Sequence, residues 1–104
     1  MKFLTINMTE VANIPAVIQA SDKVLASPPP GIKVEANYVC LGMMPFPGVP
    51  PNTMVSFTIS EVESAEAMAT VSYPTMLAGA TIHRVPILEM PVGAITKEEK
   101  KYRG

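Results

Sequence analysis

The sequence predicts an α+β domain in which strands and helices follow one another in the order β-α-β-β-α-β. Three observations support this fold class. Apolar and polar residues alternate in four segments, as they do in strands, and apolar residues recur at helical spacing in two other segments. Proline and glycine, 11 and 6 of the 104 residues, gather mainly between these segments, where they end or join elements.

The N-terminal end of the chain predicts one strand and one helix. Residues 2–8 carry aliphatic side chains at every second position, which is the period of a strand. We expect Thr9 to cap a helix that extends to Leu25, because apolar residues between them recur every three or four positions. The proline run at residues 28–30 then ends the helix.

The middle of the chain predicts two strands joined by a proline-rich connection. Residues 32–44 alternate, so that Val34 and Ala36 are expected on the same face of a strand. Residues 45–52 contain four prolines, whose missing N–H groups exclude a central strand there. Residues 53–61 show the clearest alternation and predict the third strand.

The C-terminal half predicts a second helix and a fourth strand. Ser64 has the side chain of a helix N-cap, Pro74 is expected to kink or end the helix, and Gly79 is expected to terminate it. Residues 81–90 predict the last strand, in which Pro86 marks a sheet edge or a bulge.

These elements predict one domain over residues 1–92, followed by a charged tail over residues 93–104 that we expect to be a frayed helix or disordered. Two right-handed crossovers around a central hairpin give the ferredoxin-like arrangement, a four-stranded antiparallel sheet with both helices on one face. We expect the helices to cover the more apolar face and to leave the mixed face open. The predicted covered face carries Leu4, Ile6, Met8, Val55, Phe57 and Ile59, and the predicted open face carries Phe3, Thr5, Asn7, Met54, Ser56 and Thr58.

Composition and charge argue against several classes of protein. The formal net charge is −1, and four of the eight basic residues lie among the last eight positions, so the body of the domain is acidic. We therefore expect no binding to nucleic acid, which needs a basic face. The single cysteine and the lack of a signal-peptide pattern or a long apolar run predict a soluble protein of the cytoplasm, with no membrane partner.

The low charge content predicts self-association. Charged residues make up 16% of the chain, against ~25% in a typical globular domain. Part of the surface is therefore expected to be apolar, and a second copy of the chain would cover it. We expect a homodimer, with another homo-oligomer as the alternative.

Four stretches of the sequence, taken in order, resemble the dimeric α+β barrel superfamily and its small uncharacterised bacterial and archaeal members. They read MKFL, GIKVEANYVCLG, MVSFTISEVESAEAMA and AGATIHRVPILEMP, and the resemblance spans about residues 1–92. It implies that two chains pair their open sheet faces into a closed barrel. Because the superfamily includes monooxygenases, lactone isomerases, haem-binding proteins and ligand-binding proteins, the resemblance selects no single function.

His83, the only histidine, is the candidate catalytic residue. An imidazole ordinarily titrates near neutral pH, so this side chain could act as a general acid or base. The resemblance also allows a role as a haem ligand. The alternative is a histidine near the start of a strand that is bonded to a neighbour or to water.

Polar side chains of the predicted strands are the candidate ligand-binding residues. They are Asn7, Asn37, Tyr38, Ser56 and Thr58, together with Thr5. A few such groups in an apolar pocket could orient a small polar ligand. The alternative is that they form cross-strand hydrogen bonds on a sheet face that is partly exposed to solvent.

No metal ion and no cofactor are predicted. One histidine, one cysteine and scattered carboxylates give no cluster at the spacing of metal ligands. Cys40 is expected to be a buried, small apolar side chain. The alternative is a nucleophilic pair formed by Cys40 and His83.

Two function classes remain. The first is a small-molecule-binding protein, with a cavity between sheet and helices or inside a dimeric barrel. If it catalyses a reaction, the resemblance implies proton transfer or cofactor-free oxygenation, with His83 as acid or base and Asn7 and Asn37 as orienting groups. The second is a structural or regulatory assembly domain. An enclosed cavity near His83 would favour the first class, and a solid interface between sheets would favour the second.

Overall fold

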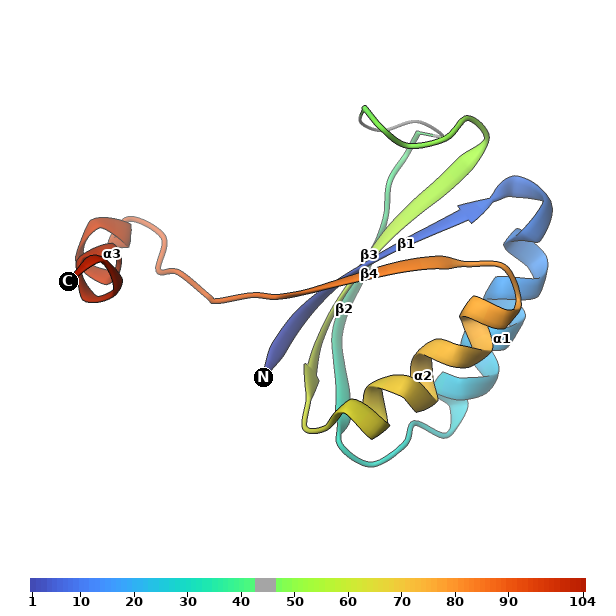
Figure 1. The fold of residues 1–104 in the computed structure, drawn as a ribbon, viewed down its shortest axis with the longest axis horizontal. Coiled ribbons are helices and arrows are strands. Elements are labelled where there is room, and N and C mark those ends of the chain that lie inside the picture. The colour runs from blue at the N-terminus through green and yellow to red at the C-terminus, as the bar shows by residue number, and fades with distance from the viewer. Residues whose placement is uncertain (43–46) are drawn as a thin grey trace.

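The computed structural model describes residues 1–42 and 47–104 of the chain. It is a small α+β domain with a four-stranded antiparallel sheet, as the sequence predicted (Figure 1). In chain order the elements are β1 (Lys2–Glu10), the short 3-10 helix η1 (Val11–Asn13), α1 (Ile14–Ala26), β2 (Ile32–Val39), β3 (Thr53–Val62), α2 (Ala65–Leu77), β4 (Thr81–Pro86) and α3 (Ile95–Arg103).

The strands of the sheet have the order β2-β3-β1-β4, and every neighbouring pair is antiparallel. Ile6 on β1 lies opposite Phe57 on one side and opposite His83 on the other. Directly paired residues project from the same face of a sheet, so this register assigns each strand residue to one of two faces. β4 is an edge strand, as Pro86 predicted, but it ends at Pro86 and is shorter than the predicted strand over residues 81–90.

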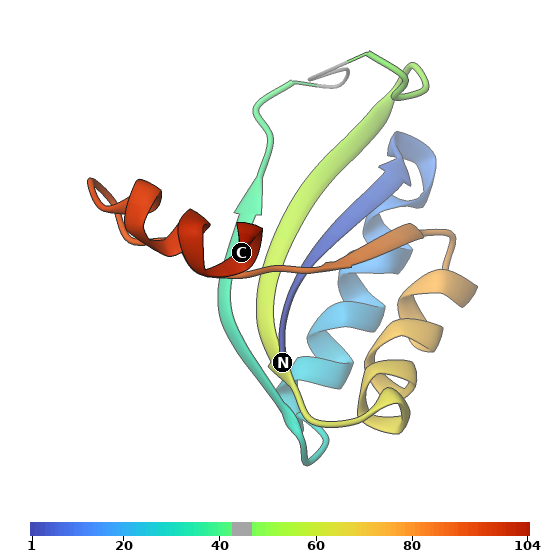
Figure 2. The ribbon, with the colours of Figure 1, turned by 60° about the vertical axis from the view of Figure 1, so that its left-hand side comes forward.

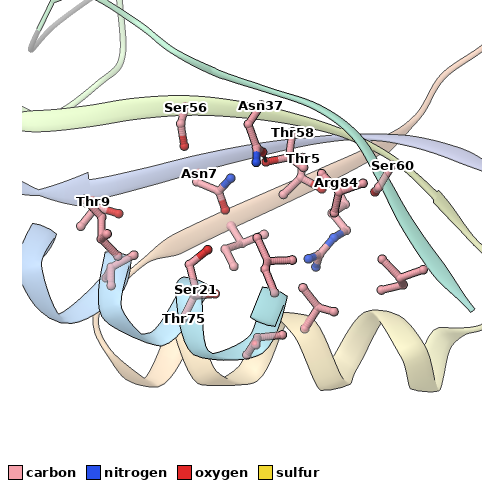
Figure 3. A pocket seen from close by; sticks show the side chains of 18 of the residues that line it. Thr5, Asn7, Thr9, Ser21, Asn37, Ser56, Thr58, Ser60, Thr75 and Arg84 are labelled. Atoms are coloured by element: carbon pink, nitrogen blue, oxygen red, sulfur yellow. Dashed lines mark hydrogen bonds between the residues drawn. The ribbon is translucent and has the colours of Figure 1, made fainter. Parts of the chain in front are cut away.

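Helices α1 and α2 lie side by side on one face of the curved sheet (Figures 1 and 2). The covered face is not the one that the sequence analysis predicted. The side chains of Thr5, Asn7, Ser56 and Thr58 lie beneath the helices (Figure 3). The other face, called the open face below, carries Leu4, Ile6, Met8, Val55, Phe57, Ile59, His83 and Val85. Of these residues Val55 is fully buried, whereas His83 and Val85 are exposed.

The exchange of faces has a physical reason. Alternation shows which side chains share a face of a strand, but it does not show which face meets the helices. The prediction assumed that the helices cover the more apolar face, because burial of apolar area drives folding. In the structure the covered face has polar residues at its centre, and apolar residues around them form the contacts with the helices. Val17, Val62 and Ala67 are only 7%, 6% and 7% exposed and hold sheet and helices together there.

Strand β2 departs from the predicted alternation at Glu35. Val34 pairs with a residue of the covered face and Ala36 with a residue of the open face, so the two do not share a face as predicted. The extra residue between them is a β-bulge, which reverses the alternation in the remainder of the strand. As a result Asn37 faces the helices and Tyr38 faces away from them.

Strand β2 is also shorter than the predicted strand over residues 32–44, because it ends at Val39. The amide of Cys40 still donates a hydrogen bond to the carbonyl of Val55, at 2.9 Å. Residues 43–46, which include the predicted end of the strand and the start of the proline-rich connection, lie outside the described residues.

Helix α2 begins and ends at the predicted signals. The amide of Ala67 donates to Ser64 Oγ at 3.1 Å, which is the hydrogen bond of an N-cap. At the other end, the amides of Gly79 and Ala80 donate to carbonyls of the last turn, both at 3.0 Å. This pair of bonds is the Schellman arrangement, and it needs the positive φ of +118° that Gly79 adopts.

Two local predictions differ from the structure. Pro74, which was predicted to kink or end the second helix, does not end it, because the helix continues as one element to Leu77. The hydroxyl of Ser72 donates to a carbonyl one turn earlier, at 2.6 Å, and so adds a hydrogen bond close to the proline. Thr9 belongs to β1 and is 1% exposed, so it does not cap the first helix. That helix begins at Ile14, after η1, with a proline in its first turn.

Replacement of Gly79 by alanine is expected to lower the free energy of unfolding by about 1–3 kcal/mol. An alanine would have to adopt a φ of +118°, and its Cβ would lie 2.7 Å from Asn13 Nδ2. Urea unfolding followed by circular dichroism measures the change. Gly42→Ala is the control, because a Cβ there meets no described residue within 4 Å and the backbone needs no positive φ. Equal stabilities of the two variants would contradict the prediction.

The chain leaves the domain after β4 as a C-terminal arm, residues 87–104. The amide of Ile87 donates to the carbonyl of Lys2 at 3.0 Å, and Glu89 Oε2 lies 3.6 Å from Lys2 Nζ. Beyond this anchor the arm runs away from the sheet to α3, on the side opposite α1 and α2 (Figures 1 and 2). The tail, predicted as a frayed helix or disorder, thus contains a helix of 9 residues.

The chain exposes more surface than a compact monomer of its mass. Its accessible surface is 7117 Å², whereas about 5,700 Å² is expected for 11.1 kDa. Its radius of gyration is 15.6 Å, whereas about 13 Å is expected for this length. The C-terminal arm and the open face both contribute to the excess.

Candidate functional site

A cavity of about 350 Å³ lies between the covered face of the sheet and the two helices (Figure 3). This volume is within the range of small-molecule sites, about 300–1,000 Å³. The polar residues that line the cavity are Thr5, Asn7, Thr9, Asn37, Ser56, Thr58, Ser60 and Arg84 from the sheet, and Ser21 and Thr75 from the helices.

Most of the polar side chains of the sheet come from the two central strands, β1 and β3, which carry hydroxyl or amide groups at every second position. In the register of β1 and β3, Thr5 lies opposite Thr58 and Asn7 lies opposite Ser56. Side chains of a strand alternate between faces, so all four project to the same side. They form the polar floor of the cavity, and we use that name for these four residues.

Part of the polar floor is hydrogen-bonded and part is not. Thr58 Oγ1 donates to Asn37 Oδ1 at 2.6 Å, which is a cross-strand bond of the kind the sequence analysis kept as an alternative. The side chains of Asn7 and Ser56 form no hydrogen bond with any other described residue. No fully buried polar side-chain atom of the described residues lacks a partner, so these two groups remain accessible from the cavity. A polar group in such a place needs water or a ligand as its partner.

Apolar side chains close the rest of the cavity. The helices contribute Val17, Ile18, Val24, Leu25, Met68 and Val71, and the strands contribute Ile32, Val34, Val39, Met54, Val62 and Ile82. A mainly apolar wall with a few polar groups is the usual composition of a ligand pocket. The arrangement can enclose an apolar body and orient one or two polar groups on it.

Arg84 is the only charged residue among the described residues that line the cavity. It lies on β4 opposite Thr5, and Figure 3 shows its guanidinium in the space between sheet and helices. Burial lowers the pKa of Arg84, because removal from water disfavours the charged form. The guanidinium nevertheless stays charged, since arginine does not lose its proton in proteins.

The cavity brings together most of the predicted ligand-binding residues. Asn7, Asn37, Ser56 and Thr58 all line it. Tyr38 borders the cavity, but its pairing places its side chain on the open face, and the residue is 62% exposed. That these residues bind a ligand stays a prediction.

The candidate catalytic residue lies elsewhere. His83 is exposed on the open face, where it pairs with Ile6, and it does not line the cavity. Cys40 is half-buried rather than fully buried. It follows β2 at one edge of the sheet, whereas His83 lies on β4 at the other edge. With strands about 4.8 Å apart, roughly 14 Å separates the two residues, which excludes a nucleophilic pair within one chain.

Five polar residues of the cavity lining were not predicted from the sequence, namely Thr9, Ser21, Ser60, Thr75 and Arg84, and two of them have a signal in the sequence. Arg84 is one of two charged residues, with Glu89, in the predicted strand over residues 81–90, and it lies between Ile82 and Val85, which is a signal for a charged group on a covered face. Ser21 interrupts the apolar stripe of the first helix, which is a signal for a polar group opposite it. Both signals are weak until the register of the strands is known.

Three further observations bear on the site. Within residues 1–42 and 47–104, no three histidine, cysteine, aspartate or glutamate side chains gather so that they could hold a metal ion. None of the helices in this part of the chain has the length and apolar character needed to cross a membrane. No protein-family model matches the chain, and no curated protein matches its sequence.

Proposed function

We propose that this protein binds a small molecule in the cavity between its sheet and helices, and that it works as a homodimer. The observation that carries the proposal is the polar floor beneath the helices. Folding usually places apolar groups under helices, because a buried polar group without a partner costs about 1–3 kcal/mol. This chain instead places Asn7 and Ser56 there, and the aliphatic neighbours of these residues in β1 and β3, such as Ile6 and Val55, lie on the other face of the sheet.

A purely structural explanation of the polar floor is weaker. If these groups served only the fold, they would bond to one another, as Asn37 and Thr58 do. Asn7 and Ser56 instead keep access to the cavity. Apolar side chains at these two positions would pack the helices onto the sheet more tightly. Hydrogen bonds to a ligand would give the two polar groups a function.

The assembly that we propose is a dimeric α+β barrel of ferredoxin-like subunits. The strand order β2-β3-β1-β4, with both connecting helices on one face, supports the ferredoxin-like arrangement. The open face supports the barrel, since a second sheet would cover Ile6, Phe57 and their neighbours. The excess accessible surface, on the order of 1,400 Å², is similar to what each partner of an obligate dimer buries.

The proposal is binding rather than catalysis. The described lining of the cavity holds no carboxylate, histidine or cysteine, so general acid or base groups are missing from that part of the site. Proton transfer or cofactor-free oxygenation stays an implication of the resemblance alone. His83 faces the proposed interface between subunits instead of the cavity.

Replacement of His83 by alanine is accordingly expected to leave ligand binding unchanged within about twofold, since distant sites act independently. The compounds used to measure binding are benzyl alcohol, benzamide, benzoate and benzylamine. Asn7→Leu is the matched comparison, because it removes a polar group from the floor of the cavity and should weaken the binding of a polar probe. A tenfold loss of affinity in His83→Ala would place the histidine in the site and contradict the prediction.

A titration with four ring compounds tests the proposed function. Benzyl alcohol, benzamide, benzoate and benzylamine share a phenyl ring and differ in one substituent, which is neutral, neutral, anionic or cationic. Each is added to the ¹⁵N-labelled protein while its amide resonances are recorded. We expect at least one compound to bind saturably and to shift the amides of Asn7, Ser56, Thr58 and Val71. If all four leave these resonances unchanged at millimolar concentration, the proposal fails.

The open face and the C-terminal arm favour a second candidate function, assembly without a ligand. Leu88, Val92 and Ile95 on the arm are 61%, 100% and 53% exposed, and a neighbouring subunit would cover them. Exposed apolar side chains in such number are typical of an interaction surface. A stable oligomer to which none of the four ring compounds binds would support this second function.

A further inference from the structure

Arg84 carries a charge that the cavity itself does not balance. The described residues of the lining include no aspartate and no glutamate. The ion pairs within the described part of the chain use the N-terminus, Lys2, Lys101 and Arg103, and none of them includes Arg84. Arg84 also forms no side-chain hydrogen bond with another described residue.

A comparison with Lys2 shows how unusual this is. Lys2 is an accessible cation, yet its Nζ lies 3.1 Å from Glu35 and 3.6 Å from Glu89. The hydrogen bond to Glu35 and the charges of both carboxylates raise the pKa of Lys2. Arg84 is half-buried, and burial lowers its pKa without a carboxylate to compensate. A partly desolvated charge without a partner is unfavourable, so an anion that enters the cavity would relieve a cost already present in the fold.

We propose that the ligand of this cavity is a small, mainly apolar monocarboxylate whose carboxylate binds Arg84. This inference rests on the proposed function and adds the chemical class of the ligand. The planar guanidinium can donate two parallel hydrogen bonds to one carboxylate. One cation in the lining matches one negative charge, and the aliphatic wall around Val17, Leu25 and Val71 matches an apolar body.

The rest of the cavity is consistent with this class of ligand. Asn7 and Ser21 project into the cavity from the sheet and from α1, as Figure 3 shows. They could bind one further hydroxyl or carbonyl group on the ligand. A dianion would bring a second negative charge into a lining whose described residues offer a single cation, and a cationic ligand would meet the like charge of Arg84.

The four ring compounds also test this inference. Benzoate and benzamide have nearly the same shape and differ in charge, so their affinities report the contribution of the carboxylate. We expect benzoate to bind at least about tenfold more tightly than benzamide, because hydrogen bonds to charged groups exceed those to neutral groups. Arg84→Gln should lower the affinity for benzoate by about tenfold or more, whereas the affinity for benzyl alcohol should stay the same. Arg84→Lys keeps the positive charge but loses the planar guanidinium that can donate two parallel hydrogen bonds. It should therefore retain part of the preference for benzoate over benzamide.

The outcomes separate the inference from the function on which it rests. If benzyl alcohol or benzamide binds in the cavity but benzoate has no advantage, the carboxylate proposal is overturned and the binding function stands. The same conclusion follows if Arg84→Gln keeps its native amide spectrum and binds benzoate as tightly as the unmodified chain. If no ring compound binds, the proposed function itself fails. The comparison of benzoate with benzamide uses the unmodified chain, so it stays decisive even if Arg84→Gln does not fold.

Discussion

Replacement of Ile6 by aspartate is expected to convert the proposed homodimer into a monomer. Ile6 lies at the centre of the open face, between Phe57 and His83 on the neighbouring strands. In a barrel formed by two such faces, a carboxylate at this position would be buried without a partner in both subunits. A penalty of this kind should weaken the dimer by at least about 100-fold. Sedimentation velocity over a range of protein concentrations measures the shift.

A matched variant separates charge from position. Gln19→Asp introduces the same charge at an exposed residue of α1, on the helical side of the domain, and should remain dimeric. The Ile6→Asp monomer should keep the far-ultraviolet circular dichroism of the parent, because the open face is not under the helices. Two results would refute the proposed assembly. One is an unmodified chain that sediments as a monomer at high micromolar concentration, and the other is an Ile6→Asp chain that dimerises as well as its parent.

The elements of the fold could be predicted from the sequence because their signals act over a few residues. The N-cap at Ser64 and the stop at Gly79 each depend on one turn of helix, and both are where the sequence placed them. The alternation over residues 53–61 is contained within a single strand, so it can be recognised without knowledge of the other strands. A local rule for proline could not show that α2 continues past Pro74, because it does not include the tertiary contacts that hold the helix together.

The orientation of the sheet could not be predicted in the same way. Alternation groups Ile6 with its apolar neighbours and Asn7 with its polar neighbours, but either group could lie beneath the helices. The bulge at Glu35 has no sequence signal of its own, and it exchanges the faces of every later residue in β2. Both errors arise from long-range pairing, which a single sequence does not report.

The candidate site was predicted in part for the wrong reason. Asn7, Asn37, Ser56 and Thr58 do lie together, because residues that share a face also share a cavity. Asn7, Ser56 and Thr58 were predicted on an open face, but they lie under the helices. Arg84 was missed because its position beside Thr5 depends on the register of β1 and β4.

A single alternation links the proposed site to the proposed assembly. The residues that bring hydroxyl and amide groups beneath the helices are the neighbours in sequence of the aliphatic residues on the open face. A slip of one residue in the register would exchange both faces and would remove the cavity lining and the apolar surface together. The proposed binding and the proposed dimerisation would therefore depend on the same strands, and a variant that changes one should be tested for the other.

Replacement of Ser21 by phenylalanine is expected to abolish binding of the ring compounds. Ser21 projects from α1 towards Asn7, so a phenyl ring there would fill much of the cavity. The affinity should fall by at least about tenfold, since the new ring occupies the volume that the ligand needs. The free energy of unfolding should change little. A buried phenyl ring contributes about 1.5–3 kcal/mol, and loss of water from a polar group such as Asn7 costs about 1–3 kcal/mol.

Gln19→Phe is the control for this prediction. It places the same ring on the same helix at an exposed position, two residues away and therefore on a different side of α1. It should bind the ring compounds as the parent does. The two variants together distinguish a filled cavity from a general effect of phenylalanine on α1. Unchanged binding in a folded Ser21→Phe chain would mean that the compounds bind elsewhere, because a ligand and the new ring cannot occupy one volume.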